Sequence, residues 1–249
     1  MAKSKVEKIR ERNHVAALKA PYNFCDRWCA HCDVTDRCSL YQEEIHEKLN
    51  QMADGKDPES LKCSIESVKK NLQKSFKLVQ KIAKEEGIDL KASPFDEEEI
   101  KLAKLRSRKR RQHALSRLSY AFCGEARAFL KRYYYRKSAD YSEDHINEYQ
   151  TLEWYHTLLP AKIHRLLGSL YEEEKTTLLL EVNLDDAVAQ MDLCSKAIAL
   201  CQITCDKLTL PHPMDLVPLA KMRTFLDKMK EELEILEDQI GSGSLLDRF

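Results

Sequence analysis

The chain has 249 residues, and its 41 Lys and Arg balance 41 Asp and Glu to a net charge of zero. Hydrophobic residues make up 43% of the sequence and charged residues 33%, a composition typical of globular rather than disordered chains. Charge neutrality argues against a dedicated nucleic-acid-binding protein, because such proteins carry a basic excess. Only six glycines are present, too few for the turns of a Rossmann fold, a TIM barrel or a β-sandwich, so the composition predicts an all-α protein.

The first residues and the apolar runs bear on where the protein is located. The segment Met1–Val6 carries two lysines and lacks the apolar centre of a signal peptide. No run of the sequence approaches the roughly 18 apolar residues that a membrane span needs. We therefore expect a cytoplasmic protein without a membrane partner, in which the nine cysteines stay reduced.

The first distinctive segment in chain order is a loop with four cysteines. Cys25, Cys29, Cys32 and Cys38 follow the spacing C-x3-C-x2-C-x5-C. Thiolates this close in one short loop converge on one centre, and in a reducing compartment a metal is their natural partner. The sequence therefore predicts a metal site with these four ligands.

Two helices are expected after the loop. A short amphipathic helix covers about residues 40–52. A longer helix opens at Asp57-Pro58, where Asp57 caps it and Pro58 suits its first turn, and it ends at Gly87. Its apolar side chains recur at steps of three and four residues, at Leu61, Ile65, Val68, Leu72, Phe76, Val79 and Ile82. This stripe predicts that the helix packs against other helices.

Four further helices follow. The third helix starts at Ser93-Pro94 and runs to about residue 137, and the fourth covers about residues 142–170, with a kink expected at Pro160. The fifth covers about residues 185–208. The sixth starts near Pro213 or Pro218, and its apolar residues alternate at three and four like the seam of a bundle helix. These residues are Leu219, Met222, Leu226, Met229, Leu233, Leu236 and Ile240.

Five long helices that each carry one apolar stripe pack most simply as an up-and-down bundle. The predicted organisation is an N-terminal segment at 1–55 with the metal loop at 25–38, a helical bundle at 56–240 and a flexible tail at 241–249. The one candidate strand, at residues 178–182, fits a helix equally well.

The cysteine spacing leaves the metal open between an iron–sulfur cluster and zinc. Structural zinc usually uses two C-x2-C pairs a dozen or more residues apart, whereas ferredoxin-type clusters use thiols from one run. Cys29-x2-Cys32-x5-Cys38, followed by Tyr41, resembles the end of the 4Fe–4S loop of endonuclease III-type DNA glycosylases. The resemblance covers about 14 residues and departs at the first cysteine, which is separated from the next by six residues in the glycosylases and by three here. It therefore implies a cluster, and no glycosylase activity is carried over.

Polar residues also fall within the apolar faces of the bundle helices. Glu125 lies inside the stripe of the third helix, and Glu148 and His156 lie in the apolar sector of the fourth, with Glu153 at its edge. Glu153-x-x-His156 has the spacing with which di-iron bundles bring a carboxylate and an imidazole to one metal. These four residues are the candidate catalytic residues. A buried Glu–His hydrogen bond that fixes helix register is the alternative interpretation.

Three cysteines of the fifth helix, Cys194, Cys201 and Cys205, share the middle of its apolar face. A free cysteine behaves as a small hydrophobic residue, so these thiols are expected to belong to the core, with a second thiolate site as the alternative.

Three functions follow from these predicted sites. The leading hypothesis is an iron–sulfur protein whose cluster has a structural, electron-transfer or sensing role. The second is a zinc-stapled scaffold that binds a protein partner, in which metal binding folds the N-terminal segment. The third is a metal-dependent helical-bundle enzyme that uses the Glu and His residues of the core.

Overall fold

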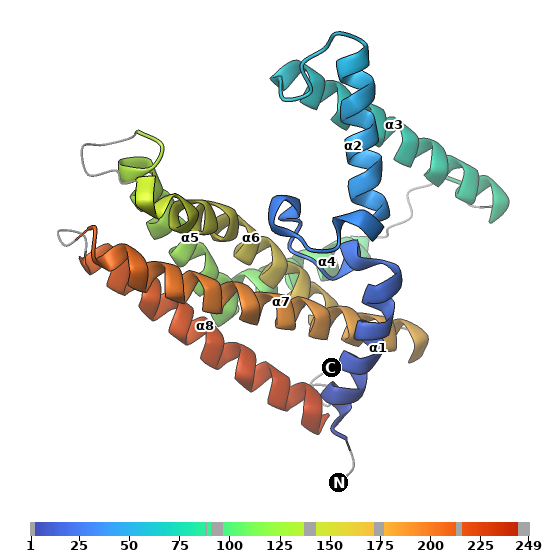
Figure 1. Cartoon of the computed structure of the whole chain (residues 1–249). Helices are drawn as coiled ribbons and strands as arrows, with labels where there is room; N and C mark the ends of the chain where they lie inside the picture. Colours follow the sequence, from blue (N-terminus) through green and yellow to red (C-terminus); the bar gives the residue numbers. More distant parts are fainter. Residues whose placement is uncertain are drawn as a thin grey trace. The chain divides into compact units, whose positions relative to one another are not determined.

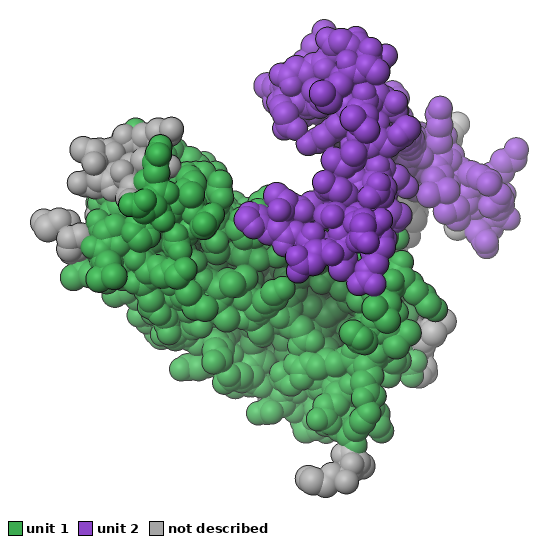
Figure 2. Space-filling model, viewed as in Figure 1, with its two compact units in different colours: residues 1–28, 105–249 green, residues 29–104 purple. Residues whose placement is uncertain are grey.

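A computed structural model describes residues 3–87, 89–90, 97–136, 143–171, 177–212 and 216–243 (Figure 1). Over these ranges the chain forms helices and turns and no strand, which confirms the all-α prediction. The chain divides into two compact units, one of residues 1–28 and 105–249 and one of residues 29–104 (Figure 2). The division expected from the sequence, after residues 55 and 240, lies at other points.

The larger unit contains an up-and-down bundle, as predicted, and it is built from four long helices where the sequence predicts about five. Each helix contacts the next along the chain, and the first also contacts the last, so the four close into a ring around one core (Figure 1). The helices are α5 (Ala114–Tyr133), α6 (Ile146–Tyr171), α7 (Thr177–Thr209) and α8 (Leu216–Ser242). The seam of α8 is confirmed, since its seven predicted apolar residues are all buried.

A further helix, α1 (Lys5–Lys19), packs against α7 and α8. The sequence stripe does not predict it, because Val6 and Ile9 are its only buried apolar residues. Ser4 caps α1: its side chain accepts a hydrogen bond from the Glu7 backbone N–H at 3.1 Å, and its own N–H donates to the Glu7 carboxylate at 2.6 Å. Such a capping box supports a helix whose apolar face is narrow.

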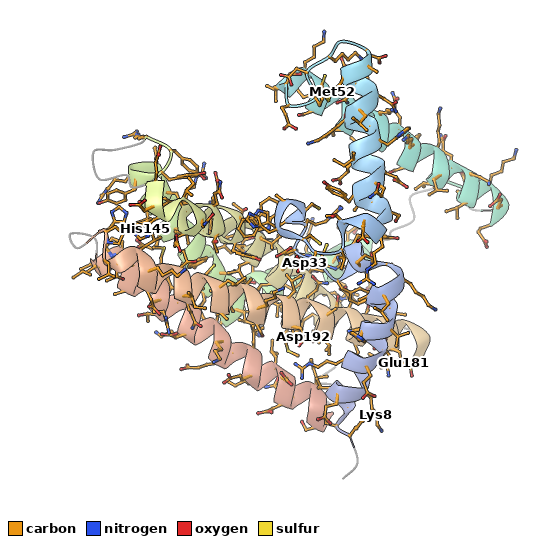
Figure 3. The ribbon with its side chains drawn as sticks, viewed as in Figure 1. Lys8, Asp33, Met52, His145, Glu181 and Asp192 are labelled. Carbon is orange, nitrogen blue, oxygen red and sulfur yellow. The ribbon has the colours of Figure 1, made fainter. Side chains whose placement is uncertain are left out.

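One arginine ties α1 to both of its neighbours. The Arg10 guanidinium donates to Asp192 on α7 at 2.7 Å and to Glu237 on α8 at 2.6 Å. Asp192 accordingly lies on the side of α7 that faces α1 (Figure 3). The Asn13 side chain adds a 2.8 Å hydrogen bond to the Asp185 carbonyl of α7. Directional polar contacts therefore position α1 as much as apolar burial does.

Several predicted boundaries differ from those of the structure. The helix expected from 93 to 137 is two helices, α4 (Glu97–Gln112) and α5, because the chain bends at His113, whose ring nitrogen accepts the Leu115 N–H at 3.2 Å. α7 begins before the expected residue 185 and includes the candidate strand at 178–182. The expected starts at Ser93-Pro94, Ser142 and Pro213 lie outside the described residues, as does all but the first part of the tail 241–249.

The smaller unit holds two of the predicted helices. They are α2 (Ser39–Ala53) and α3 (Leu61–Glu85), preceded by the short 3₁₀ turns η2 (Cys29–His31) and η3 (Thr35–Arg37). Ser60 rather than Asp57 caps α3, by accepting the Cys63 N–H at 3.3 Å. The sequence places α3 in the bundle range 56–240, whereas the structure assigns it to this unit, and its apolar stripe is exposed. Periodicity identifies residues that share a face of a helix, but it does not identify what covers that face.

Crossing a bilayer requires a helix of sufficient length and apolar composition, and none of the described helices meets that requirement.

Candidate functional site

The segment that leads into the cysteine loop is anchored on α6 through Asp26. The Asp26 carbonyl accepts the Trp154 indole N–H at 3.1 Å, and its carboxylate accepts the Tyr155 hydroxyl. The same carboxylate accepts the Trp28 backbone N–H at 3.1 Å. Burial raises the pKa of Tyr155, and the hydrogen bond with Asp26 raises it further, so this phenol stays protonated and acts as a donor. Asp26 therefore fixes the backbone on both sides of Arg27.

Arg27 stands at a sharp turn between these two fixed residues. Its φ of 63° makes it the one non-glycine residue in the left-handed region among those described. An L-residue with a side chain pays on the order of 1 kcal/mol for this conformation, so the contacts of its neighbours must hold the turn. The chain is thereby redirected between Cys25 and Cys29.

Cys25 lies beside a half-buried lysine of α6. The Lys162 ammonium donates to the Cys25 carbonyl at 3.2 Å, and the Cys25 thiol lies 3.8 Å from the Tyr22 carbonyl. Burial, with a smaller contribution from Arg165, lowers the pKa of Lys162. The backbone of Cys25 is therefore held in place, while its side chain remains partly exposed.

The other three cysteines lie at the start of the smaller unit. Cys29 and Cys32 form the ends of a 3₁₀ turn, in which the Cys32 N–H donates to the Cys29 carbonyl at 3.3 Å. Side chains three residues apart eclipse one another in such a turn, so this pair is arranged on one side of the backbone. Cys38 is buried at the N-cap of α2, and its N–H donates to the Thr35 carbonyl at 3.4 Å. Local structure thus orients Cys29 and Cys32 together and fixes the backbone of Cys38.

The four thiols do not form a preassembled metal centre. Within the described ranges, no three His, Cys, Asp or Glu side chains are grouped so that they could hold a metal ion. No disulfide joins any of the nine cysteines, all of which lie in those ranges. The donor set suits a soft metal or an iron–sulfur cluster.

Two of the candidate catalytic carboxylates form ion pairs across the bundle. Glu125 on α5 lies 3.6 Å from the Lys221 ammonium of α8. Glu148 on α6 accepts a hydrogen bond from Lys207 of α7 at 2.8 Å and has His145 at 3.9 Å. The hydrogen bond with Lys207 is the main cause that lowers the pKa of Glu148. Each carboxylate therefore contacts a lysine on a neighbouring helix.

The other two candidates, Glu153 and His156, are neighbours on α6 that face different partners. His156 is buried, and its Nδ1 lies 2.7 Å from the Glu153 carbonyl and 3.1 Å from the Leu152 carbonyl. The Glu153 carboxylate interacts with Tyr135 and contributes to the raised pKa of that phenol, after the larger effect of burial. The structure therefore brings His156 to the backbone of its own helix and no three of the four candidates into a metal-binding group among the described residues.

The three cysteines of α7 lie in the core, as their shared apolar face predicts. Cys194, Cys201 and Cys205 are all buried. Burial raises the pKa of Cys194 and of Cys205 to about 12, and it raises the pKa of Cys201 well above its ordinary value. In the folded bundle these side chains pack in the core as small hydrophobic groups.

The residues that anchor the cysteine loop were not predicted from the sequence. Asp26, Trp154, Tyr155 and Lys162 contribute the fixed contacts, yet none belongs to a motif. One signal was available, because the chain has only two tryptophans, and one of them lies inside the cysteine loop.

The chain matches no family model, no curated protein and no solved structure in comparisons with known proteins. The resemblance to the endonuclease III-type loop consequently depends on the residues around Cys29, Cys32 and Cys38 alone.

Proposed function

We propose that this chain is a cytoplasmic metal-binding protein whose ligands are Cys25, Cys29, Cys32 and Cys38, and that the metal is an iron–sulfur cluster. The observation that carries the proposal is the presence of four thiols within 14 consecutive residues. Chain connectivity alone keeps such thiols close together. Four ligands from one continuous run favour a cluster over structural zinc.

The local structure around the individual cysteines supports the proposal. The 3₁₀ turn already sets Cys29 and Cys32 on one side of the backbone, and Cys38 begins α2. A negatively charged thiolate–metal centre at that position is favoured by the positive end of the α2 dipole. Cys25 follows the segment that Lys162 holds on α6.

This arrangement favours a structural role for the metal, with electron transfer or sensing as further uses of the same cluster. A site whose ligands are not preassembled gains its geometry as the metal binds, so part of the binding free energy goes into ordering the loop. The indole of Trp28 lies within the loop, where it would limit the access of water to a cluster.

A zinc-stapled interaction scaffold is the second candidate, and the exposed apolar face of α3 favours it. Leu61 is 77% exposed and Leu72 is 66% exposed, although both belong to one continuous stripe. Exposed apolar surface of this extent is typical of protein-binding sites. In this function, zinc would order the loop that precedes α2 and α3 without redox chemistry.

One preparation separates the two candidates. The full chain is purified without oxygen, its visible absorption spectrum is recorded, and iron, sulfide and zinc are counted on the same sample. A brown protein with matched iron and sulfide supports the cluster, and a colourless protein with one zinc supports the scaffold. Cys32→Ala should lose the metal, whereas Cys123→Ala, a matched change on α5, should retain it. A chain without metal, or metal retained by Cys32→Ala, would overturn the proposal.

A further inference from the structure

Lys162 of α6 is a half-buried cation whose charge is incompletely compensated. Its ammonium can donate more than one hydrogen bond, and among the described residues it donates one, to the Cys25 carbonyl at 3.2 Å. It forms no ion pair with a carboxylate of that part of the chain. A charge that is removed from water costs free energy unless an opposite charge or further hydrogen bonds compensate it. The position of this ammonium therefore favours an anion beside it.

The acidic side chain that influences Lys162 from the bundle is Asp186 of α7, and its carboxylate is used by other groups. It pairs with Arg165 at 2.6 Å and accepts hydrogen bonds from Ser169 at 2.7 Å and Gln190 at 3.1 Å. After burial, the charge of Arg165 is the next cause that lowers the pKa of Lys162. The bundle thus leaves this ammonium without a carboxylate of its own.

The backbone around Cys25 is held against the same face of α6. Lys162 binds the Cys25 carbonyl, and the contacts of the following residue lie further along the helix. That residue, Asp26, accepts hydrogen bonds from Trp154 at 3.1 Å and from Tyr155. Tyr155 and Lys162 are separated by about two helical turns, so they face the same side of α6 roughly 10 Å apart. These contacts fix where Cys25 lies relative to the ammonium.

The Cys25 thiolate is the anion that the ammonium can compensate. The Cys25 side chain is partly exposed and belongs to the residue whose carbonyl Lys162 binds. Its ionised form would raise the pKa of Lys162, against the larger effect of burial, so the two charges are close enough to interact. Thiolate ligands give a zinc or iron–sulfur centre a net negative charge, and a cation beside such a ligand stabilises it.

We propose that Lys162 is the counter-charge of the thiolate–metal centre, placed by α6 next to the Cys25 ligand. This inference rests on the proposed metal site and adds to it a residue of the bundle. Lys162 acts through Cys25, so it is a positioning residue and not a ligand. It would favour the metal-bound thiolate and, in a cluster, the reduced state, which carries the greater negative charge.

The first test compares the metal affinity of charged and uncharged variants. Cobalt(II) is titrated into the metal-free full chain against a competing chelator, because its absorption reports ligation by thiolates. Lys162→Met removes the charge from an unbranched side chain and should weaken cobalt binding about tenfold, whereas Lys162→Arg should recover most of the affinity. Equal affinity of Lys162→Met and the parent chain would overturn the inference alone. A parent chain that binds no cobalt would overturn the metal site and the inference with it.

A matched control separates a local charge from the total charge of the chain. Lys230 of α8 is exposed, and α8 lies diagonally across the bundle from α6. Lys230→Met removes the same charge and should leave cobalt binding unchanged. If both methionine variants weakened binding equally, the effect would come from net charge, and Lys162 would not be the counter-charge.

The stability of the metal-free chain distinguishes a counter-charge from a structural anchor. Without metal, Lys162→Met replaces an incompletely compensated charge by an apolar side chain, so urea unfolding should show no loss of stability. A loss of stability with unchanged cobalt affinity would show that Lys162 only anchors the Cys25 backbone, and it would overturn the inference.

The reduction potential gives a readout that anchoring of the backbone does not move. In a preparation that contains an iron–sulfur cluster, Lys162→Met should lower the potential, because it removes a positive charge that favours the reduced state. Lys162→Arg should restore the potential of the parent chain. Equal potentials in all three chains would contradict a counter-charge at this position.

Discussion

Trp28 lies parallel to Trp154, with their ring centroids 5.8 Å apart and their planes 12° apart. These are the only tryptophans of the chain, so both indoles are used in one contact between the cysteine loop and α6. Tyr155 meets the same Trp28 ring edge-on, with centroids 5.7 Å apart. The loop is therefore attached to the bundle by an aromatic cluster next to the Asp26 hydrogen bonds.

Removal of the Trp28 ring should loosen this attachment. Trp28→Ala should lower the free energy of unfolding by about 1–3 kcal/mol, since it removes an aromatic pair and part of its buried area. Urea unfolding followed by circular dichroism measures the change. Trp28→Phe keeps a ring that can stack on Trp154 and should recover most of the loss. An alanine variant as stable as the parent chain would show that the stacked pair does not hold the loop.

His156 and Cys32 should respond in opposite ways to substitution. His156→Ala should destabilise the bundle by about 2 kcal/mol, because it removes a buried side chain that is hydrogen-bonded to backbone carbonyls. Its metal content should equal that of the parent chain. Metal analysis and thermal unfolding of both variants measure these two effects separately. If His156→Ala lost the metal and Cys32→Ala retained it, the metal would bind in the core of the bundle. That result would favour the hypothesis of a metal-dependent enzyme.

The bundle helices were predictable because their burial is continuous. On α8, the alternation of three and four residues runs from Leu219 to Ile240, and each of these positions faces the core. α3 carries a stripe of similar quality, yet its side chains are exposed. The two helices have similar periodicity and differ in what surrounds them. A stripe therefore predicts an amphipathic helix, but it does not predict which elements pack against that helix.

The attachment of the cysteine loop could not be derived from spacing. Asp26 and Tyr155 are 129 residues apart, and their hydrogen bond exists only because α6 passes beside the loop. Arg10 likewise joins Asp192 and Glu237 across the bundle. Such contacts depend on tertiary arrangement, while the cysteine motif is local and is visible in the sequence alone.

Glu148 gives a prediction about stability and pH. The pKa of Glu148 is lowered in the folded state, mainly by the hydrogen bond from Lys207. Its contribution to the free energy of unfolding is therefore present above the unfolded-state pKa and is lost as pH falls through the folded-state pKa. Glu148→Gln should therefore destabilise the chain by roughly 1 kcal/mol at pH 7. In acid, below both pKa values, the variant and the parent chain should be equally stable. Urea unfolding at the two pH values measures the difference.

The matched control is Glu143→Gln, which alters an exposed carboxylate in the short turn before α6. It should change the stability at neither pH, because no ion pair of the described residues depends on Glu143. If Glu148→Gln were as stable as the parent chain at pH 7, the pair with Lys207 would contribute nothing to the bundle.

The cysteines should fall into two classes of reactivity. Thiolates and not thiols react with iodoacetamide, and burial raises the pKa of Cys194 and Cys205 to about 12. In the folded, metal-free chain at pH 8, these two and Cys201 should remain unlabelled. The half-buried Cys25, Cys29 and Cys32 should be labelled. Mass spectrometry of peptides from the labelled chain assigns each site.

Bound metal should lower the reactivity of the loop cysteines, and denaturant should raise the reactivity of the α7 cysteines. Bound metal should protect the loop cysteines, because a coordinated thiolate cannot attack the reagent. Urea should expose Cys194, Cys201 and Cys205 and lower their pKa values towards the ordinary range, so all of them become labelled. Loop cysteines that stay reactive in a metal-loaded sample would show that the metal is bound elsewhere. Labelling of the α7 cysteines at the loop's rate in the folded chain would show that this part of the core opens to solvent.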